Sequence, residues 1–147
     1  MNRHIIAEIQ SDIRQTQPLI HCITNPISIN QCANAILAVG GRPMMAEHPE
    51  EVAEITRTAH ALLLNLGNIT DIRMESIQIS AEAAVKADVP VVLDAVGIAC
   101  SRLRRSFVHK LLSTLTPTLS RAIIQRSMRC IGTTTALPVW MQTRLWI

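Results

Sequence analysis

Aromatic side chains are nearly absent: the sequence has no Tyr, one Phe and two Trp. A hydrophobic core must therefore be built mainly from Ile, Leu, Val, Ala and Met. Long apolar runs are missing too. None approaches the roughly 18 residues that mark a membrane-spanning helix, so we expect no contact with a membrane. The N-terminus carries Glu8 and Asp12 and lacks an apolar segment, which argues against a secretory signal peptide.

Several motifs that identify a specific chemistry are also missing. The sequence contains no Walker A motif, no G-x-G-x-x-G and no nucleophile elbow. Its four cysteines form no C-x-x-C pair, which argues against a zinc site and favours a reduced, cytoplasmic protein. The histidines lack the spacing of a catalytic or metal-ligating set, so we expect them to be packing or surface residues.

Acidic residues are absent from the last 29 residues, which follow Thr118. The segment 119–147 holds four Arg and both Trp, whereas residues 1–118 hold ten Lys and Arg against all 11 acidic residues. The formal net charge of +3 is thus a property of the segment 119–147. Because residues 1–118 offer no convincing basic face, we expect no nucleic-acid partner.

Short apolar runs alternate with amphipathic segments before Thr118. The runs predict strands at residues 19–23, 43–46 (a strand or an extended loop), 61–66 and 90–94. Helical patterns precede Pro18, run from Asn25 to Gly40, open at His48-Pro49, run from Thr70 or Asp71 to about Ala87, and begin at Ser101. Strands that are apolar on both faces and alternate with helices indicate an α/β fold, a parallel sheet covered by helices.

Helical periodicity also predicts which residues face the core. In the helix that ends near Ala87, the expected inner residues are Ile72, Ile77, Ala81, Ala84 and Val85. In the helix that begins at Ser101, they are Leu103, Phe107, Leu111 and Leu112. The arginines of that helix are expected on its solvated face; they are Arg102, Arg104 and Arg105.

Polar residues follow the predicted strands, at the edge where parallel sheets bind ligands. Asp94 can face Mg²⁺ or a phosphoryl group, or it can simply cap the following turn. Asn25 can hydrogen-bond a ligand, but Asn equally favours a helix cap. Met45 can line an apolar pocket or belong to the core. Asn65 and Gly67 form a similar polar group at a strand end, and an ordinary turn is the simpler interpretation of this pair.

Six segments carry a resemblance to a known family. They are Ile23-Thr24-Asn25, Ala33-Asn34-Ala35, the stretch from Gly40 to Ala46, Glu50-Glu51-Val52, the stretch from Leu64 to Gly67 and the stretch from Val89 to Gly97. As an ordered set, from about Pro18 to Thr118, they resemble hydroxyethylthiazole kinase. One departure is Ala95, where the family usually has Pro.

The resemblance implies a ribokinase-like fold, incomplete in this chain, and a homotrimer with sites between subunits. It implies transfer of the γ-phosphoryl group of ATP, with Mg²⁺, to the alcohol of 4-methyl-5-(2-hydroxyethyl)thiazole in thiamine salvage. By the same resemblance Met45 would contact the thiazole and Asn25 would lie near it. Asp94 would help to hold Mg²⁺ and ATP, and Arg121 stands where the family has a basic ATP-binding residue.

The resemblance stops at Thr118, where the family continues into an N-x-x-E motif that supplies a carboxylate for Mg²⁺. Read from the last base of the Thr118 codon, codons that the sequence permits encode V-I-K-G-N-Y-S-E-I-N-A-L-Y, which contains N-Y-S-E. We therefore expect residues 1–118 to be the N-terminal part of a kinase domain and residues 119–147 to be an out-of-frame tail. On this hypothesis the chain is inactive and poorly soluble, no catalytic residue is assigned, and the charge of Arg121 is a coincidence of the new frame.

The alternative is a non-catalytic small-molecule-binding or interaction protein in which the basic segment 119–147 is genuine. That segment shows no clear apolar periodicity, which disfavours the alternative.

Overall fold

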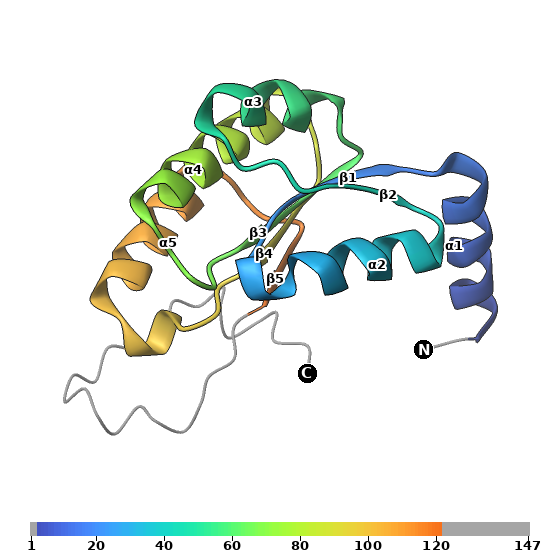
Figure 1. The fold of residues 1–147 in the computed structure, drawn as a ribbon, viewed down its shortest axis with the longest axis horizontal. Coiled ribbons are helices and arrows are strands. Elements are labelled where there is room, and N and C mark those ends of the chain that lie inside the picture. Colours follow the sequence, from blue (N-terminus) through green and yellow to red (C-terminus); the bar gives the residue numbers. More distant parts are fainter. Residues whose placement is uncertain (1–2, 122–147) are drawn as a thin grey trace.

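A computed structural model describes residues 3–121 of the chain (Figure 1). Five strands form one sheet in the order β2-β1-β3-β4-β5, and all neighbouring strands are parallel. The strands are β1 (Leu19–Ile23), β2 (Arg42–Met44), β3 (Ala61–Asn65), β4 (Val91–Asp94) and β5 (Leu119–Arg121). The helices are α1 (Arg3–Thr16), α2 (Ile29–Val39), α3 (Pro49–Thr58), α4 (Asp71–Lys86) and α5 (Arg102–Thr114). The predicted α/β pattern and the predicted order of its elements are confirmed.

Residues with the right chemistry set the ends of the helices. Thr70, rather than Asp71, caps α4, because its hydroxyl accepts a hydrogen bond from the amide of Arg73 at 3.3 Å. Helix α2 ends at Gly40, whose φ of +102° lies in the left-handed region that glycine adopts without strain. A β-carbon on Gly40 would lie 2.9 Å from Cγ of Arg14, so glycine here also allows α1 to approach the end of α2.

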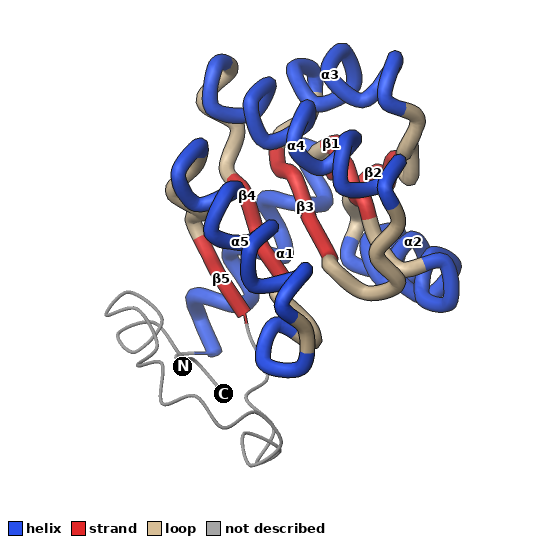
Figure 2. The backbone as a smooth tube through the Cα atoms, turned by 90° about the vertical axis from the view of Figure 1, so that its left-hand side faces the viewer, coloured by secondary structure: helices blue, strands red, loops and turns tan. Residues whose placement is uncertain are grey.

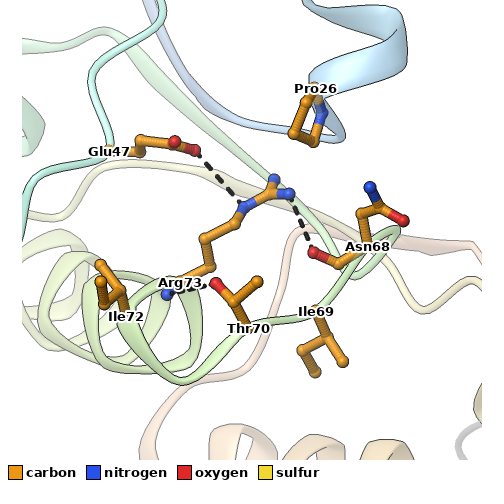
Figure 3. Close-up of a pocket in the computed structure, with 7 residues that line it drawn as sticks. All are labelled: Pro26, Glu47, Asn68, Ile69, Thr70, Ile72 and Arg73. Carbon is orange, nitrogen blue, oxygen red and sulfur yellow. Dashed lines mark hydrogen bonds and ion pairs between the residues drawn. The ribbon is translucent and has the colours of Figure 1, made fainter.

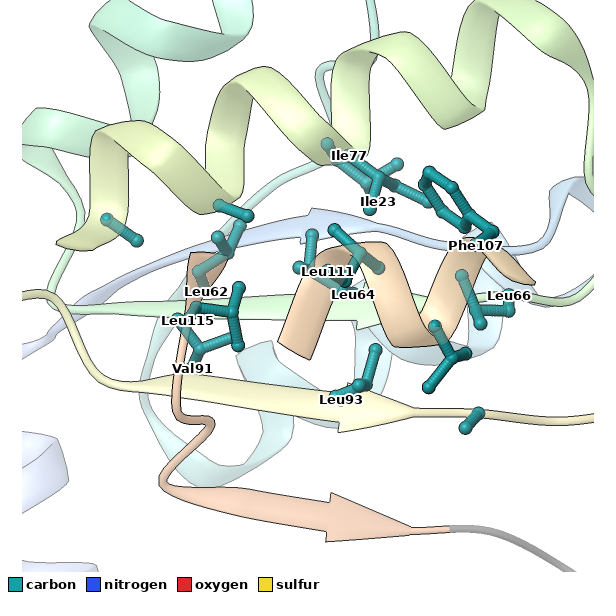
Figure 4. Close-up of a cluster of buried hydrophobic side chains, with 14 of the residues drawn as sticks. Ile23, Leu62, Leu64, Leu66, Ile77, Val91, Leu93, Phe107, Leu111 and Leu115 are labelled. Atoms are coloured by element: carbon teal, nitrogen blue, oxygen red, sulfur yellow. The ribbon is translucent and has the colours of Figure 1, made fainter. Parts of the chain in front are cut away.

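Helices cover one face of the sheet over its central strands. Helices α3, α4 and α5 lie on this side, and α2 lies on the other (Figure 1). Six residues of β1, β3 and β4 on this face are at most 4% exposed; they are His21, Ile23, Leu62, Leu64, Val91 and Leu93. The apolar members of this set form a single cluster with Ile77 of α4 and with Phe107 and Leu111 of α5 (Figure 4). In the edge strand β2, Met44 shares this face and is 39% exposed.

The opposite face is only half covered. The alternate strand residues Ile20, Ala61, Leu63 and Val92 all stay partly exposed, whereas Cys22 is 1% exposed. Helix α2 connects β1 to β2 and packs against β2. Among the elements of residues 3–121, no other helix covers β3 and β4 on this side (Figures 1 and 2). The expected cover of helices is therefore present over β1, β3 and β4 on one face alone.

Some of the predicted inner residues of the helices are wrong. Ile72 and Val85 of α4 are 61% and 53% exposed, and Leu103 of α5 is 53% exposed. Helix α4 packs against α3 as well as against the sheet, which turns a wide face of mostly small residues inward. The buried residues of α4 are Arg73, Ser76, Ile77, Ser80, Ala81, Ala83 and Ala84. In α5, Val108 is buried in addition to the predicted Phe107.

Helix α1 is amphipathic, as predicted, but its apolar face lies outside the core. Ile5, Ile6 and Ile9 are 50%, 44% and 53% exposed. The helix makes its main contacts with α2. Neither α1 nor any other helix in residues 3–121 has the length and apolar character needed to cross a membrane.

His21 is a buried polar residue that links three elements. Its side chain is 0% exposed, and Nδ1 lies 2.9 Å from the hydroxyl of Thr56 in α3. Its Nε2 lies 3.0 Å from the carbonyl oxygen of Ala46, which follows β2. Burial lowers the pKa of His21 from its ordinary 6.5, more than the Ala46 hydrogen bond and the charge of Glu51 raise it. The predicted packing role is confirmed for this histidine.

The unequal cover of the sheet leads to a prediction for two neighbouring leucines of β3. Leu64→Ala empties a fully buried site, so we expect it to lower the free energy of unfolding by about 2–5 kcal/mol. Leu63→Ala removes a side chain that water already reaches, and its effect should be clearly smaller. Chemical denaturation of both variants measures the difference. Equal losses would mean that the half-covered face is buried in solution.

The buried histidine predicts a pH dependence of stability. The pKa of His21 is lowered in the folded state, so below about pH 6.5 the unfolded chain binds a proton at this residue more readily than the folded chain does. The free energy of unfolding should therefore fall with decreasing pH, by up to ~1.4 kcal/mol per pH unit. Stability conferred by neutral His21 is therefore present above pH 6.5 and declines as the pH falls. His21→Gln should flatten the slope between pH 6.5 and 5, and exposed His109→Gln should not. Parallel pH profiles for the wild type and His21→Gln would contradict this.

Candidate functional site

A crevice lies between the loops that follow β1 and β3, with Pro26 on one side and Asn68 on the other, where the chain connections diverge. The connection after β1 leads to α2 on one side of the sheet, and the connection after β3 leads to α4 on the other (Figure 1). Parallel α/β sheets bind ligands at such a switch point, because the two departing loops leave room between them. Of the predicted residues, Asn25 follows β1 and Asn65 ends β3, whereas Met45 follows β2 and Asp94 ends β4.

Asn25 lies on the β1 side of this crevice and serves as a cap. Its Oδ1 accepts a hydrogen bond from the amide of Ile27 at 3.0 Å and begins the short 3₁₀ helix Pro26–Ser28. Its Nδ2 is directed toward Gly67: a β-carbon on Gly67 would lie 2.9 Å from Nδ2 and 2.8 Å from Oδ1 of Asn65. A side chain at Gly67 would have to displace these two amide groups, so the two loops approach closely. The capping alternative is confirmed for Asn25, and its amide nitrogen lies against Gly67.

Asn65 and Asp94 continue the same polar group across the sheet. They are register partners at the ends of β3 and β4. Nδ2 of Asn65 donates to Oδ2 of Asp94 at 3.1 Å, and Oδ1 of Asn65 accepts from the amide of Gly67 at 2.7 Å. Asn65 thus orients the Asp94 carboxylate and the Gly67 turn together. A turn was the simpler expectation for Asn65, and the structure adds its link to Asp94.

Met45 follows β2, on the far side of β1 from β3. The residue is partly buried, and the next two carbonyl groups are both anchored. The carbonyl of Ala46 lies 3.0 Å from Nε2 of His21, and that of Glu47 accepts a hydrogen bond from the hydroxyl of Ser76 at 2.7 Å. Met45 is therefore held at the same edge of the sheet as Asn25, on a neighbouring strand.

Arg73 lies in the first turn of α4 and reaches into the crevice. Its guanidinium donates to the carbonyl oxygens of Thr24, Gly67 (3.3 Å) and Asn68 (3.1 Å), and its Nε lies 3.4 Å from a carboxylate oxygen of Glu47. Arg73 is 4% exposed. Burial lowers its pKa, while the Glu47 carboxylate raises it in part. Guanidinium groups remain charged in proteins, so this charge is matched by Glu47 and three carbonyl dipoles.

A cavity of about 430 Å³ opens beside this cluster (Figure 3). Arg73 and Glu47 form part of its wall, and Pro26 faces them from the other side. The remaining lining residues are Asn68, Ile69, Thr70 and Ile72. The cavity thus lies between the loop that carries Asn25 and the N-terminal turn of α4.

Two arginines of α5, Arg104 and Arg105, were expected on a solvated face, but this expectation is wrong because both bind backbone carbonyl groups. Arg104 is partly buried, and its Nη1 donates to the carbonyl oxygens of Leu66 and Val96 (3.2 Å). Nη1 of Arg105 donates to the carbonyl of Ala99 at 3.1 Å. Each arginine satisfies backbone groups that loops at the strand ends leave unpaired. Arg102 is exposed, as expected.

Several site residues were not recognised in the sequence. Arg73, Arg104 and the link from Asn65 to Asp94 all depend on strand register and loop conformation. A single arginine in the first turn of a helix is unfavourable next to the helix dipole, which is a weak signal for Arg73. No sequence pattern identifies which carbonyl groups an arginine reaches.

Two observations concern metal binding and the reactivity of the buried cysteine in the described part of the chain. Residues 3–121 contain no cluster of three His, Cys, Asp or Glu side chains that could hold a metal ion. Burial raises the pKa of the Cys22 thiol to about 12, so this cysteine is not a nucleophile at neutral pH. The backbone of Arg121 pairs in register with Asp94, and its side chain lies outside the described structure.

Comparisons with known proteins identify the family and the fold. Residues 10–128 match the model of the hydroxyethylthiazole kinase family. "Hydroxyethylthiazole kinase 1" of Clostridium botulinum (strain Loch Maree / Type A3) is 51% identical over 110 residues, which cover 75% of this chain and 42% of the relative. "Hydroxyethylthiazole kinase" of Finegoldia magna is 47% identical over 113 residues, 77% of this chain and 42% of the relative. The chain therefore spans less than half the length of these relatives.

A solved structure agrees with the sequence relatives. The hydroxyethylthiazole kinase protein from Pyrococcus horikoshii OT3 has a TM-score of 0.78 to this chain at 32% identity, covering 82% of this chain and 47% of that one. The expected ribokinase-like fold, present here in part, is confirmed. The chain belongs to the hydroxyethylthiazole kinase family.

Proposed function

We propose that this chain forms the thiazole-binding part of a hydroxyethylthiazole kinase, in which Asn25 and Met45 contact the substrate 4-methyl-5-(2-hydroxyethyl)thiazole. The observation that carries this proposal is a chain of polar contacts in a member of this family: Asn25 lies against Gly67, and Asn65 binds both Gly67 and Asp94. The Nδ2 of Asn25 suits a ring nitrogen or hydroxyl oxygen. The thioether of Met45 suits a flat, polarisable ring.

Asp94 is the proposed ligand for Mg²⁺ in a complex with ATP. Mg²⁺ in such sites uses one or two carboxylates and completes its coordination with phosphate oxygens and water. A single carboxylate, partly buried and oriented by Asn65, fits that requirement. When bound, the ion would neutralise the charge that develops on the transferred phosphoryl group. Arg121 is the proposed basic contact to ATP, and its backbone lies beside Asp94.

Assembly and location belong to the same proposal. We expect the homotrimer that the family resemblance implies, with sites between subunits, and a cytoplasmic protein. The partly exposed Leu63 and Val92 and the exposed Ile5 and Ile9 are apolar surface that such an assembly could bury.

Substrate binding is the direct test. We expect the full chain to bind 4-methyl-5-(2-hydroxyethyl)thiazole in ligand-observed NMR. Asn25→Ala should weaken that binding roughly tenfold, the value of one lost hydrogen bond to a ligand. Asn34→Ala, a change on the exposed side of α2, is the matched control and should leave the affinity unchanged. Failure of the wild-type chain to bind the thiazole would contradict the proposed function.

The division of the chain at Thr118 is a separate proposal, and DNA tests it. Strand β5 begins at Leu119, and residues 122–147 lie outside the described structure. We expect DNA read from the last base of the Thr118 codon to encode K-G-N-Y-S-E and then further family-like sequence. Restoring that frame should produce ATP-dependent phosphorylation of the thiazole, an activity that we expect the 147-residue chain to lack. The absence of such a frame would make the segment 119–147 genuine.

A further inference from the structure

Arg73 connects the two segments that carry the proposed substrate-binding residues, Asn25 and Met45, with the loop after β3. We infer that Arg73 and Glu47 are a positioning pair: the guanidinium sets the separation of the loops after β1 and β3, and its ion pair with Glu47 holds the segment that contains Met45. The assignment of a substrate to this place rests on the proposed function. The positioning itself rests on the contacts of Arg73 alone.

The guanidinium bonds to both sides of the crevice. On the β1 side it donates to the carbonyl of Thr24, the residue before Asn25. On the β3 side it donates to the carbonyls of Gly67 (3.3 Å) and Asn68 (3.1 Å). Asn25 Nδ2 lies against Gly67 across the same gap. One rigid group therefore fixes the distance between the two loops that the Asn25 side chain spans.

Glu47 extends this control to the third segment. The residue lies two positions after Met45, and its carboxylate pairs with Nε of Arg73 at 3.4 Å (Figure 3). The side chain of Glu47 is 46% exposed, so water can stabilise its charge without Arg73. Its partner is 5% exposed in the side chain and needs a counter-charge. The pair thus links the Met45 segment to α4 at the wall of the cavity.

Only arginine can make all of these contacts. Its planar fork directs N–H donors of Nη1 and Nη2 at three carbonyls, while its charge pairs with the Glu47 carboxylate. A lysine at the same position would keep the charge for Glu47, but a single ammonium group cannot bridge carbonyls on two loops. Asn68, whose carbonyl accepts a hydrogen bond from the guanidinium, adopts the left-handed conformation with φ of +49°.

Hydrogen exchange of the full chain tests the positioning directly. The reporter amides are those of Ile27 and Gly67, which donate to the side chains of Asn25 and Asn65. In Arg73→Met, exchange at both reporters should rise roughly tenfold or more, because the loops lose charged hydrogen bonds. Amides of Leu64 and Leu93 in the core strands should stay within about twofold. Exposed Arg57→Met is the matched control and should change neither set.

Two conservative variants separate the two halves of the inference. Arg73→Lys should speed exchange at Gly67 but leave the segment that follows Met45 protected. Glu47→Gln should speed exchange in the segment that follows Met45 and leave Gly67 protected. These variants also decide the question if Arg73→Met fails to fold. A uniform rise in exchange across the sheet, or no rise at Ile27 and Gly67, would overturn the inference, because a merely structural arginine affects all amides together.

Thiazole binding adds a second readout that is independent of exchange. Where the wild-type chain binds the thiazole, Arg73→Met should weaken the affinity roughly tenfold, while Arg57→Met should not change it. Unchanged affinity in Arg73→Met would also overturn the inference. If the wild-type chain does not bind the thiazole, the proposed function fails, and the exchange pattern still decides whether Arg73 positions the loops.

Discussion

The need to cover a parallel sheet whose strands are apolar on both faces governs this structure. Helices α3, α4 and α5 meet that need on one side, where Leu62, Leu64 and Leu93 are almost completely buried. This packing fixes the register of β1, β3 and β4, because a shift by one residue would turn the buried leucines to the other face. The register in turn brings Asn65 beside Asp94 at the strand ends. On the α2 side, most strand side chains stay half-exposed, so residues 3–121 do not fully cover this face of the sheet.

At the carboxyl edge of the sheet, hydrogen bonds from arginine side chains hold the loops in place. Loops that leave parallel strands carry carbonyl groups without ladder partners, and buried carbonyls need donors. Arg73 supplies donors to the loops after β1 and β3, and Arg104 supplies them to the loops after β3 and β4. Both side chains come from the helices of the covered face. The candidate site is therefore held by the same elements that build the core.

Predictions for single residues depended on how local their causes are. The capping of α4 by Thr70 and the end of α2 at Gly40 follow from residue chemistry, and both were predictable. The burial of α4 was predicted only in part, because packing against α3 exposes Ile72 and Val85. Arg104 looked like a surface residue because charge and helical periodicity do not show where a long side chain ends.

The sequence by itself determined the order of strands and helices, the edge at which the site forms, and the family to which the chain belongs. Periodicity, caps and ordered motifs act over a few residues and need no partner from elsewhere in the chain. Tertiary structure alone decided that Asn25 reaches Gly67, that Asn65 orients Asp94, and that one guanidinium joins three loops. These contacts link residues up to 49 positions apart. They exist only once strand register and helix packing have fixed the backbone.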